Sequence, residues 1–294
     1  MNDASEGSLD LEEVSRLVDL AIREDAGSGD ITSETLFDPG HLSRGVVLVH
    51  EEGVIAGLPV FRAVYRRISG AVRCAFRVRE GEAVGAGQEV VDLQGPTIML
   101  LMGERTALNF LQRLSGIATL TRRLAGRAAG KGITLLDTRK TTPGLRSLEK
   151  YAVRIGGGRN HRMDLSEMCL VKENHIAAAG GISAALEKMM RGGTGGKAVE
   201  VEVKDLRELE EALKFPIDRI MLDNFSPEEI SKAVERIRLA FGKGRGPKIE
   251  VSGGIGEGNI EAYFLDGVDY ISVGALTHSA RALDISMNLQ PERT

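Results

Sequence analysis

The sequence predicts an α/β protein: a C-terminal open, TIM-like α/β barrel plus an N-terminal α+β sandwich domain. Two observations predict this division. After Lys131, short continuous apolar runs alternate with helical stretches, which is typical of a parallel sheet covered by helices on both faces. From about 44 to 100, glycines separate short β-type runs, which indicates a small antiparallel or mixed sheet. We expect the N-terminal domain to span 1–115 and the barrel to span 116–278.

The composition narrows the class of protein and its partners. Of the 294 residues, 42% are hydrophobic and 27% are charged, which argues against a disordered chain. A net charge of −4 provides no basic field for nucleic acid or an anionic membrane, and the apolar runs are shorter than the roughly 20 residues that span a bilayer. Cys74 and Cys169 lie inside apolar runs, where we expect them to be buried. With no signal-like N-terminus, two cysteines predict a cytoplasmic protein without a disulfide framework.

Periodicity predicts the elements of the N-terminal domain. Apolar residues recur at three-to-four spacing over 9–24, which predicts a helix ending near Gly27. The β-type runs GVVLVH, GVIAGLPV, AVRCAFRV and QEVVDLQGP follow. A long helix is predicted over about 103–129, with Gly130 as its left-handed cap, and we place the domain boundary in this helix. Its apolar face consists of Leu108, Leu111, Leu114, Ala118 and Leu124.

Six apolar runs mark the strands of the predicted barrel: ITLLD, MCLVK, AVEVEV, RIMLD, KIEVS and YISVG. No GxGxxG follows the first run, which argues against a Rossmann domain. Ser226 and Glu229, with Pro227 between them, form a capping box that predicts a helix start. Glycines at 192–196 predict a flexible loop. Residues 279–289 predict a final helix, about 279–294 in full, that could pack on either domain and is assigned to the N-terminal one.

Charged residues and glycines follow the predicted strands. The carboxyl ends of the strands of a parallel barrel meet on one face, where active sites form. The residues at these ends are Asp137, Thr138, Arg139, Lys140, Lys172, Glu202, Asp223, Ser252, Gly253, Gly254, Gly274 and Ala275. His161 and Arg162 follow a run of three glycines between the first two strands. So regular a placement favours a binding site over a solvated edge.

The charges in this set indicate a polyanionic substrate. Arginine offers a carboxylate or phosphate two parallel donors and lysine offers a point charge, so the four cations suit such a ligand. The glycine turns after the last two strands resemble the phosphate cradle that forms late in many barrels. Glu202 and Asp223 would hold Mg²⁺ or accept hydrogen bonds from sugar hydroxyls.

At these residues the chain resembles a known family. The run DTRKTTPGLRSLEKYAVRIGGGRNHRMDLSEMCLVKENHI (Asp137–Ile176) is similar to the signature of the nicotinate-nucleotide pyrophosphorylases, also called quinolinate phosphoribosyltransferases. Further matches are EDAGSGDITS, GERTALNFLQRLSGIAT, VEVEV, MLDNF, EVSGGI and ISVGALTHSA, in order along nearly the whole chain. Glu167 stands where the family more often has aspartate, outside the charged set.

The resemblance implies a reaction and roles for the site residues. The family transfers phosphoribosyl from phosphoribosyl pyrophosphate to quinolinate, with loss of CO₂ and pyrophosphate, giving nicotinate mononucleotide for NAD synthesis. It implies Mg²⁺ and no organic cofactor. Lys140, Lys172, Glu202 and Asp223 would be catalytic, and Glu202 and Asp223 would take the metal and the ribose. The implied quinolinate clamp is Arg105, Arg139, His161, Arg162 and Lys172. The implied donor site is Lys140, Ser252, Gly253, Gly254, Val273, Gly274, Ala275 and His278. Thr138 is also expected to bind substrate.

The resemblance also implies a homodimer. Arg105 lies on the predicted helix at 103–129, away from the barrel strands, where it could equally be a solvated helix arginine. In the family this arginine reaches the active site of the neighbouring subunit. Whether dimers assemble into hexamers stays open.

Other functions fit the sequence less well. Residues 79–93 resemble half of a biotinyl or lipoyl carrier domain, but such a domain needs a lysine in a turn and the first lysine of the chain is Lys131. A thiamine-phosphate-synthase-like transferase would share the glycine turns but not TRKTTPGLR or GGGRNHR. A molybdenum-transport-associated paralogue would lack part of the clamp. A non-catalytic protein that binds acidic metabolites would not need the carboxylate pair as well.

Overall fold

The computed structural model describes residues 9–291, which form two compact units. The first unit contains the described residues up to Arg122, then Thr141–Gly157 and the residues from Ser279 onward; the second contains Arg123–Lys140 and Gly158–His278. Neither unit is continuous in sequence, and a division at residue 115 stays a prediction. Within residues 9–291, no helix combines the length and the hydropathy needed to cross a membrane.

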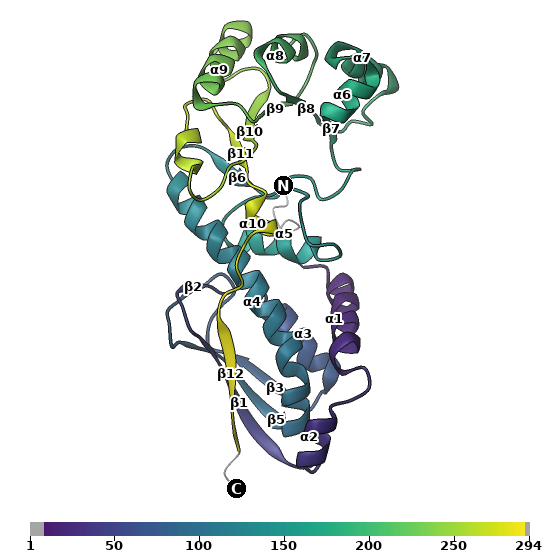
Figure 1. The fold of residues 1–294 in the computed structure, drawn as a ribbon, viewed down its shortest axis with the longest axis vertical. Coiled ribbons are helices and arrows are strands. Elements are labelled where there is room, and N and C mark those ends of the chain that lie inside the picture. Colours follow the sequence, from purple (N-terminus) through teal and green to yellow (C-terminus); the bar gives the residue numbers. More distant parts are fainter. Residues whose placement is uncertain (1–8, 292–294) are drawn as a thin grey trace. The chain divides into compact units, whose positions relative to one another are not determined.

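The first unit is built on a four-stranded antiparallel sheet with the order β12-β1-β5-β3. The strands are β1 (Leu42–Val49), β3 (Arg73–Phe76), β5 (Glu89–Pro96) and β12 (Ile285–Pro291); β2 (Gly53–Val54) pairs with β4 (Ala83–Val84). The helices are α1 (Leu11–Ala26), α2 (Ile31–Leu36), α3 (Leu58–Ile68), α4 (Thr97–Ala128) and α5 (Arg146–Ile155), and α4 continues into the second unit. Figure 1 shows the long helix α4 running beside β12. The expected α+β architecture is confirmed.

Two predicted elements of this unit are wrong. The final segment is the strand β12, not a helix, because Ile285 and Met287 alternate with more exposed residues and point into the core while the backbone pairs with β1. The run GVIAGLPV keeps strand structure only at Gly53–Val54, because Gly57 has a φ of 102° and starts α3. The Glu80 carboxylate accepts the N–H groups of Gly57 and Leu58 at this helix start.

The long helix and its neighbours follow the predicted pattern more closely. Helix α4 begins at Thr97, six residues before the expected start, and Gly130 after its end has the expected positive φ of 76°. All five residues of its predicted apolar face are buried. The capping box at Ser226 and Glu229 is present. The expectation of buried cysteines is wrong, since both thiols are free and only partly buried.

The second unit is an open barrel of six parallel strands. Their order is β6-β11-β10-β9-β8-β7, so β6 and β7 are the two edges. The strands are β6 (Thr134–Leu136), β7 (Cys169–Val171), β8 (Val199–Val203), β9 (Arg219–Asp223), β10 (Lys248–Ser252) and β11 (Tyr270–Ser272). The barrel predicted from the alternating apolar runs is therefore confirmed as an open one.

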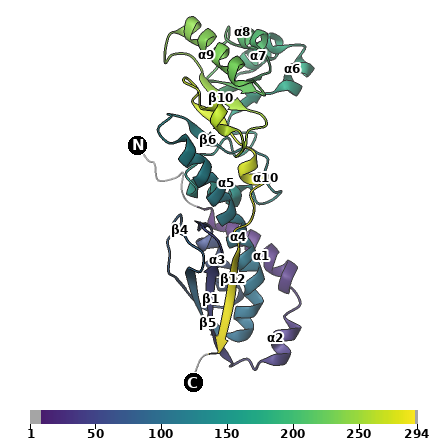
Figure 2. The same cartoon turned by 60° about the vertical axis from the view of Figure 1, so that its left-hand side comes forward.

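Helices follow the barrel strands along the chain. They are α6 (Glu173–Ala179), α7 (Ile182–Gly192), α8 (Leu206–Ala212), α9 (Pro227–Phe241), the 3₁₀ turn η1 (Ile260–Tyr263) and α10 (Ala275–His278). In Figures 1 and 2, α6 to α9 lie together on the outer side of β7–β10. In the loop before β8, Gly193, Gly195 and Gly196 have positive φ. Functional side chains can therefore lie at the strand ends and inside the barrel.

Candidate active site

Polar side chains inside the barrel form two layers, because alternate residues of a strand point to the same face. The inner layer lies within the strands and consists of Glu200, Arg219, Glu250 and Ser272, with His161 from the loop before β7. The rim layer lies at the strand ends and contains Glu202 on β8, Asp223 on β9 and Ser252 on β10. The rim contains the residues that the sequence placed at strand ends.

Two carboxylates and two lysines meet at the rim. Glu202 Oε2 accepts a hydrogen bond from Lys172 Nζ at 3.1 Å. Burial and the nearby Glu202 charge raise the pKa of Asp223, whereas the amide of Asn224 and the charges of Lys172 and Lys140 lower it. Because all these charges act on Asp223, the four predicted catalytic residues form one cluster. Such a carboxylate pair can take a cation or sugar hydroxyls.

Two arginines at the rim have buried Nε donors that the described residues leave unused. Burial and the like charge of Arg139 lower the pKa of Arg162, which is only 7% exposed. The buried Nε atoms of both guanidinium groups lack hydrogen-bond partners among the described residues. Arg162 Nη1 donates to the Met168 carbonyl at 3.0 Å, which fixes the head group. Adjacent guanidinium groups with unused buried donors favour a ligand that carries carboxylates.

The loop after β6 and helix α10 converge at Lys140. The Lys140 carbonyl accepts a hydrogen bond from Thr277 Oγ1 at 2.8 Å, and its N–H donates to Thr138 Oγ1 at 3.1 Å. A Cβ built on Gly274 would lie 3.1 Å from His278 Nε2 and 3.2 Å from Lys140 Cδ. The predicted phosphate-binding residues after β11 therefore lie beside Lys140.

The turn after β10 depends on a close contact with Asn224. Gly253 has a φ of 102°, and a Cβ there would come within 2.3 Å of Asn224 Oδ1. Asn224 itself adopts a φ of 58° and donates its N–H to the Ser252 carbonyl at 2.8 Å. Gly254 has a φ of 60°, and no atom of the described residues lies within 4 Å of its Cβ position. Because neither glycine carries a side chain, a ligand can approach the backbone of this turn closely.

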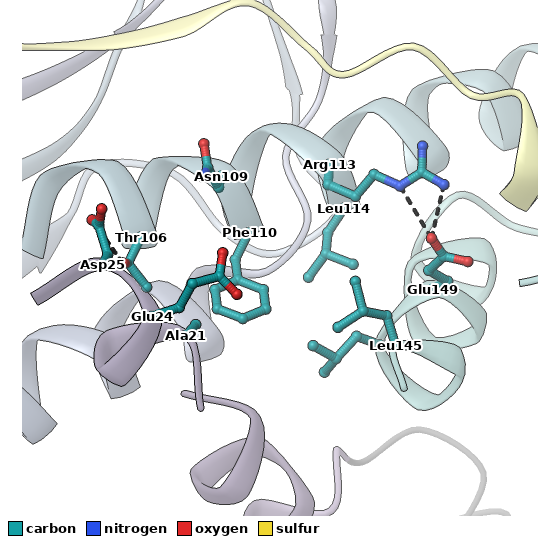
Figure 3. A pocket seen from close by; sticks show the side chains of 11 residues that line it. Ala21, Glu24, Asp25, Thr106, Asn109, Phe110, Arg113, Leu114, Leu145 and Glu149 are labelled. Carbon is teal, nitrogen blue, oxygen red and sulfur yellow. Dashed lines mark hydrogen bonds and ion pairs between the residues drawn. The ribbon is translucent and has the colours of Figure 1, made fainter. Parts of the chain in front are cut away.

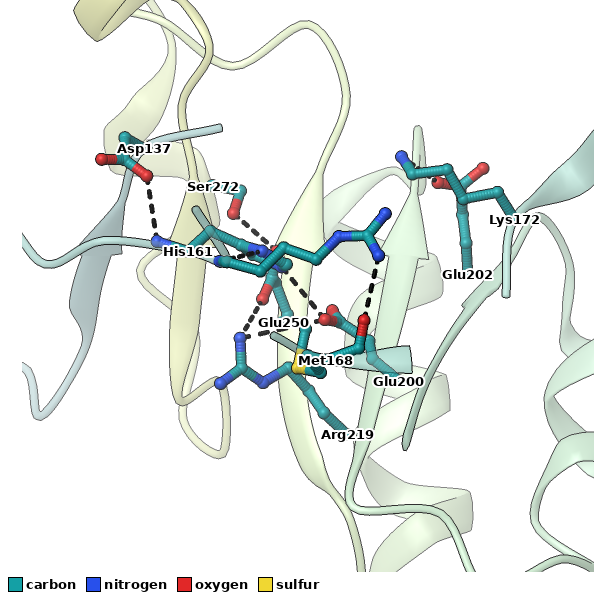
Figure 4. A network of polar contacts seen from close by, with 10 residues as sticks. Asp137, His161, Met168, Lys172, Glu200, Glu202, Arg219, Glu250 and Ser272 are labelled. Atoms are coloured by element: carbon teal, nitrogen blue, oxygen red, sulfur yellow. Dashed lines mark hydrogen bonds and ion pairs between the residues drawn. The ribbon is translucent and has the colours of Figure 1, made fainter. Parts of the chain in front are cut away.

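The inner layer was missed by the sequence analysis, except for His161. His161 Nε2 lies 3.0 Å from Glu200 Oε2 and 3.6 Å from Glu250 Oε1, as Figure 4 shows. Arg219 Nη1 lies 2.8 Å from Glu250 Oε2, and Ser272 Oγ donates to the other oxygen at 2.5 Å. Burial raises the pKa of Glu200 and of Glu250 above the ordinary carboxyl range. Charged residues spaced by two inside apolar strands, as in VEVEV, were the available signal.

The first unit contains one predicted site residue and a separate cavity. Arg105 is exposed on α4 and has no ion pair within residues 9–291. A cavity of about 180 Å³ is lined by Ala21, Glu24, Asp25, Thr106, Asn109, Phe110, Arg113, Leu114, Leu145, Leu148 and Glu149. In Figure 3 the only cation among these residues, Arg113, reaches the buried Glu149 carboxylate, 2.8 Å away. Its acidic and apolar lining does not suit a polyanion, so the barrel rim is the better candidate site.

Comparisons with known proteins identify the family of the chain. A family model described as the C-terminal domain of quinolinate phosphoribosyl transferase matches residues 117–288, and the N-terminal counterpart matches 30–115. A probable nicotinate-nucleotide pyrophosphorylase (carboxylating) of Bacillus subtilis is 38% identical, covering 94% of this chain and 93% of that protein. A quinolinate phosphoribosyltransferase (decarboxylating) 1b of Nicotiana tabacum is 37% identical, covering 94% and 82%.

A solved structure shares both units. The nicotinate-nucleotide pyrophosphorylase from Francisella tularensis has a TM-score of 0.90 and 38% sequence identity, covering 98% of this chain and 100% of that one. The match with the C-terminal domain family alone covers more than half of the chain, and the relatives match over nearly all of it. The chain therefore belongs to the quinolinate phosphoribosyl transferase family.

Proposed function

We propose that this chain transfers phosphoribosyl from phosphoribosyl pyrophosphate to the ring nitrogen of quinolinate, releasing pyrophosphate and CO₂ and giving nicotinate mononucleotide. The observation that carries this proposal is the Arg139–Arg162 pair, two adjacent guanidinium groups whose buried Nε donors have no partner among the described residues. Quinolinate carries two neighbouring carboxylates, which two arginines can bind as charge-assisted hydrogen bonds. Lys172, Arg105 and His161 complete the proposed quinolinate-binding set.

The rim carboxylates would act on the ribose. As the bond from C1′ to pyrophosphate breaks, positive charge develops on the sugar, and Glu202 and Asp223 would stabilise that charge or bind the ribose hydroxyls. Lys140 would face the leaving pyrophosphate. The two carboxylates also fit Mg²⁺, because their mutual repulsion, which raises the pKa of Asp223, falls when a cation binds between them. Bound with the substrate, Mg²⁺ would neutralise pyrophosphate charge.

Backbone groups would hold the phosphate of the donor. The turns Ser252–Gly254 and Val273–Ala275, with His278 and Thr138 beside them, would bind the 5-phosphate and its neighbours. Once the ring nitrogen has joined C1′ it is positively charged. That charge stabilises the electron pair left on C2 when CO₂ departs, and C2 then takes a proton. Most of the catalysis would come from positioning and electrostatics.

One assay tests the proposed reaction. The purified protein is incubated with quinolinate, phosphoribosyl pyrophosphate and Mg²⁺, and both CO₂ and nicotinate mononucleotide are measured. We expect equal amounts of the two products, and none when Mg²⁺ is removed with a chelator. Nicotinate replaces quinolinate in the control reaction. Turnover of nicotinate in preference to quinolinate would overturn the proposed substrate.

A homodimer with a shared active site is part of the proposal. The support is that Arg105 is exposed and unpaired in the described part of the chain, and that the family resemblance assigns it to the neighbouring site. Arg105→Ala and Lys140→Ala should each be inactive as pure proteins. Mixed after subunit exchange, they should recover up to about a quarter of the parent activity per chain if exchange is random. No recovery in a mixture that demonstrably forms mixed dimers would contradict a shared site.

A further inference from the structure

His161 is held on both ring nitrogens. Its Nδ1 accepts the backbone N–H of Arg162 at 2.8 Å, and its Nε2 lies 3.0 Å from Glu200 Oε2. A nitrogen that accepts a hydrogen bond carries no proton, so the proton of a neutral imidazole is on Nε2 and is donated to Glu200. Both side chains are buried, at 8% and 0% exposure. The imidazole therefore joins the carboxylate to the backbone of Arg162.

The charge of the same carboxylate also acts on Arg162. The like charge of Arg139 opposes the charged form of Arg162, and the charge of Glu200 supports it. The loop that contains Arg162 is also anchored at its start, since the His161 N–H donates to Asp137 Oδ1 at 2.9 Å. Two guanidinium groups that repel each other need a counter-charge beneath them to stay adjacent.

We propose that Glu200 is a positioning residue that, through the imidazole of His161 and through its own charge, fixes Arg162 beside Arg139 for the binding of a dicarboxylate. This inference rests on the proposed function and adds to it a residue that touches neither substrate. It also gives His161, a member of the proposed quinolinate-binding set, a second role, because its imidazole links Glu200 to the backbone of Arg162.

A metal site is the alternative for the same atoms. His161, Glu200 and Glu250 could each offer a ligand atom, all within 4.8 Å of one another. However, Nε2, the nitrogen that faces the two carboxylates, carries the proton and has no lone pair to give to a metal. Arg219 already supplies a positive charge to the cluster, 2.8 Å from Glu250 and 4.0 Å from Glu200. The geometry therefore favours the positioning role.

The direction in which KM for quinolinate changes in Glu200→Gln distinguishes a positioning role from a purely electrostatic effect. Glu200→Gln keeps the side-chain shape and removes the negative charge. Without positioning, that loss strengthens the binding of an anion, so KM for quinolinate would fall. With positioning, KM for quinolinate should rise about tenfold while KM for phosphoribosyl pyrophosphate stays within twofold. A fall or no change in KM for quinolinate, or an equal rise for both substrates, would refute the proposal.

A double variant tests whether Glu200 acts through His161. Asparagine at 161 can still accept the N–H of Arg162 but does not reach Glu200, so His161→Asn should raise KM for quinolinate by a similar factor. The double variant with Glu200→Gln should do no more than the larger single change. If the two single changes in KM multiply in the double variant, Glu200 and His161 act independently and the proposal fails.

Glu80→Gln is the matched control, because it changes a partly buried carboxylate at the start of α3, outside the barrel. It should leave both KM values unchanged.

Two readouts do not depend on catalysis. In ¹⁵N NMR spectra of the parent, His161 should show the tautomer protonated at Nε2, and its Nε2 signal should move in Glu200→Gln. An imidazole protonated at Nδ1 would overturn the proposal even if the enzyme is active, whereas an inactive parent with the expected tautomer would count against the proposed function alone. Incubation with Zn²⁺ should leave no bound metal after gel filtration. One retained equivalent that is lost in Glu200→Gln would identify a metal site instead.

Discussion

The barrel contains two pairs of carboxylates, Glu200 with Glu250 in the inner layer and Glu202 with Asp223 at the rim, and the surroundings of the two pairs differ. Glu200 and Glu250 are fully buried, and their charged or polar partners, Arg219, Ser272 and His161, all come from the protein. Glu202 and Asp223 are partly exposed, and the cation paired with Glu202 is a lysine that is itself 46% exposed. A charge neutralised inside the protein can serve as scaffold, whereas a charge left at the rim is available to a ligand. The following three experiments test that difference.

The largest effect is expected at the rim. Glu202→Ala and Lys140→Ala should each lower kcat by roughly 100- to 1000-fold, because each removes a charge that acts on the transition state. Steady-state kinetics with circular dichroism of the purified variants checks this, and the spectra should match the parent. Lys204→Ala is the control, since this exposed residue pairs with Glu208 next to the same strand and should change kcat less than twofold. Near-normal turnover in either variant would show that the charge removed in that variant is not needed for catalysis.

A backbone change in the rim should have a smaller effect. Gly253→Ala places a Cβ against Asn224 Oδ1 at a φ that favours glycine, so the turn must shift. We expect KM for phosphoribosyl pyrophosphate to rise about tenfold, measured with quinolinate at saturation. Gly254→Ala is the matched control, because its Cβ would meet no atom within 4 Å and only the positive φ opposes it. An equal response of the two variants would argue against the contact with Asn224.

The third effect is on stability, and it concerns the inner layer. Burial and the neighbouring Glu200 charge raise the pKa of Glu250 from an ordinary 4.5 to about 7. Between these pH values the folded protein binds more protons than the unfolded chain, so the free energy of unfolding should fall as the pH rises from about 4.5 to about 7. The loss should be roughly 2–3 kcal/mol and should shrink in Glu250→Gln. Urea unfolding at pH 5, 6 and 7 measures it, and an unchanged slope in Glu250→Gln would exclude this carboxyl as the cause.

The sequence predicted the regular parts of the fold well and the local exceptions poorly. The barrel strands and the long helix were predictable because their apolar periodicity is strong. Helix α3 was missed because its start depends on the positive φ of Gly57 and on hydrogen bonds to the Glu80 carboxylate. Glu80 is more than 20 residues away in the sequence. Strand β12 was missed because a short segment takes its structure from pairing with β1, which is more than 200 residues away.

For the site, the same limit applies. Charges at strand ends could be predicted, because the barrel topology brings these ends together. Whether they form a single cluster with the unpaired guanidinium groups depends on side-chain directions that no sequence pattern specifies. The inner layer was hidden because the residues on either side of Glu200 and of Glu250 are apolar and buried. Their partners come from other strands and one loop, so only the folded chain shows which groups they contact.

The open edges of the barrel carry one more consequence. Arg159 forms a one-residue parallel bridge to β6, donating its N–H to the Leu135 carbonyl and accepting the N–H of Asp137. That bridge occupies part of the edge that a seventh strand would otherwise use, and β7 at the other edge is only three residues long. Unpaired strand edges invite the strands of other molecules, so a covered edge and a short one limit intermolecular pairing. The loop that brings His161 and Arg162 to the site therefore also covers part of an open barrel edge.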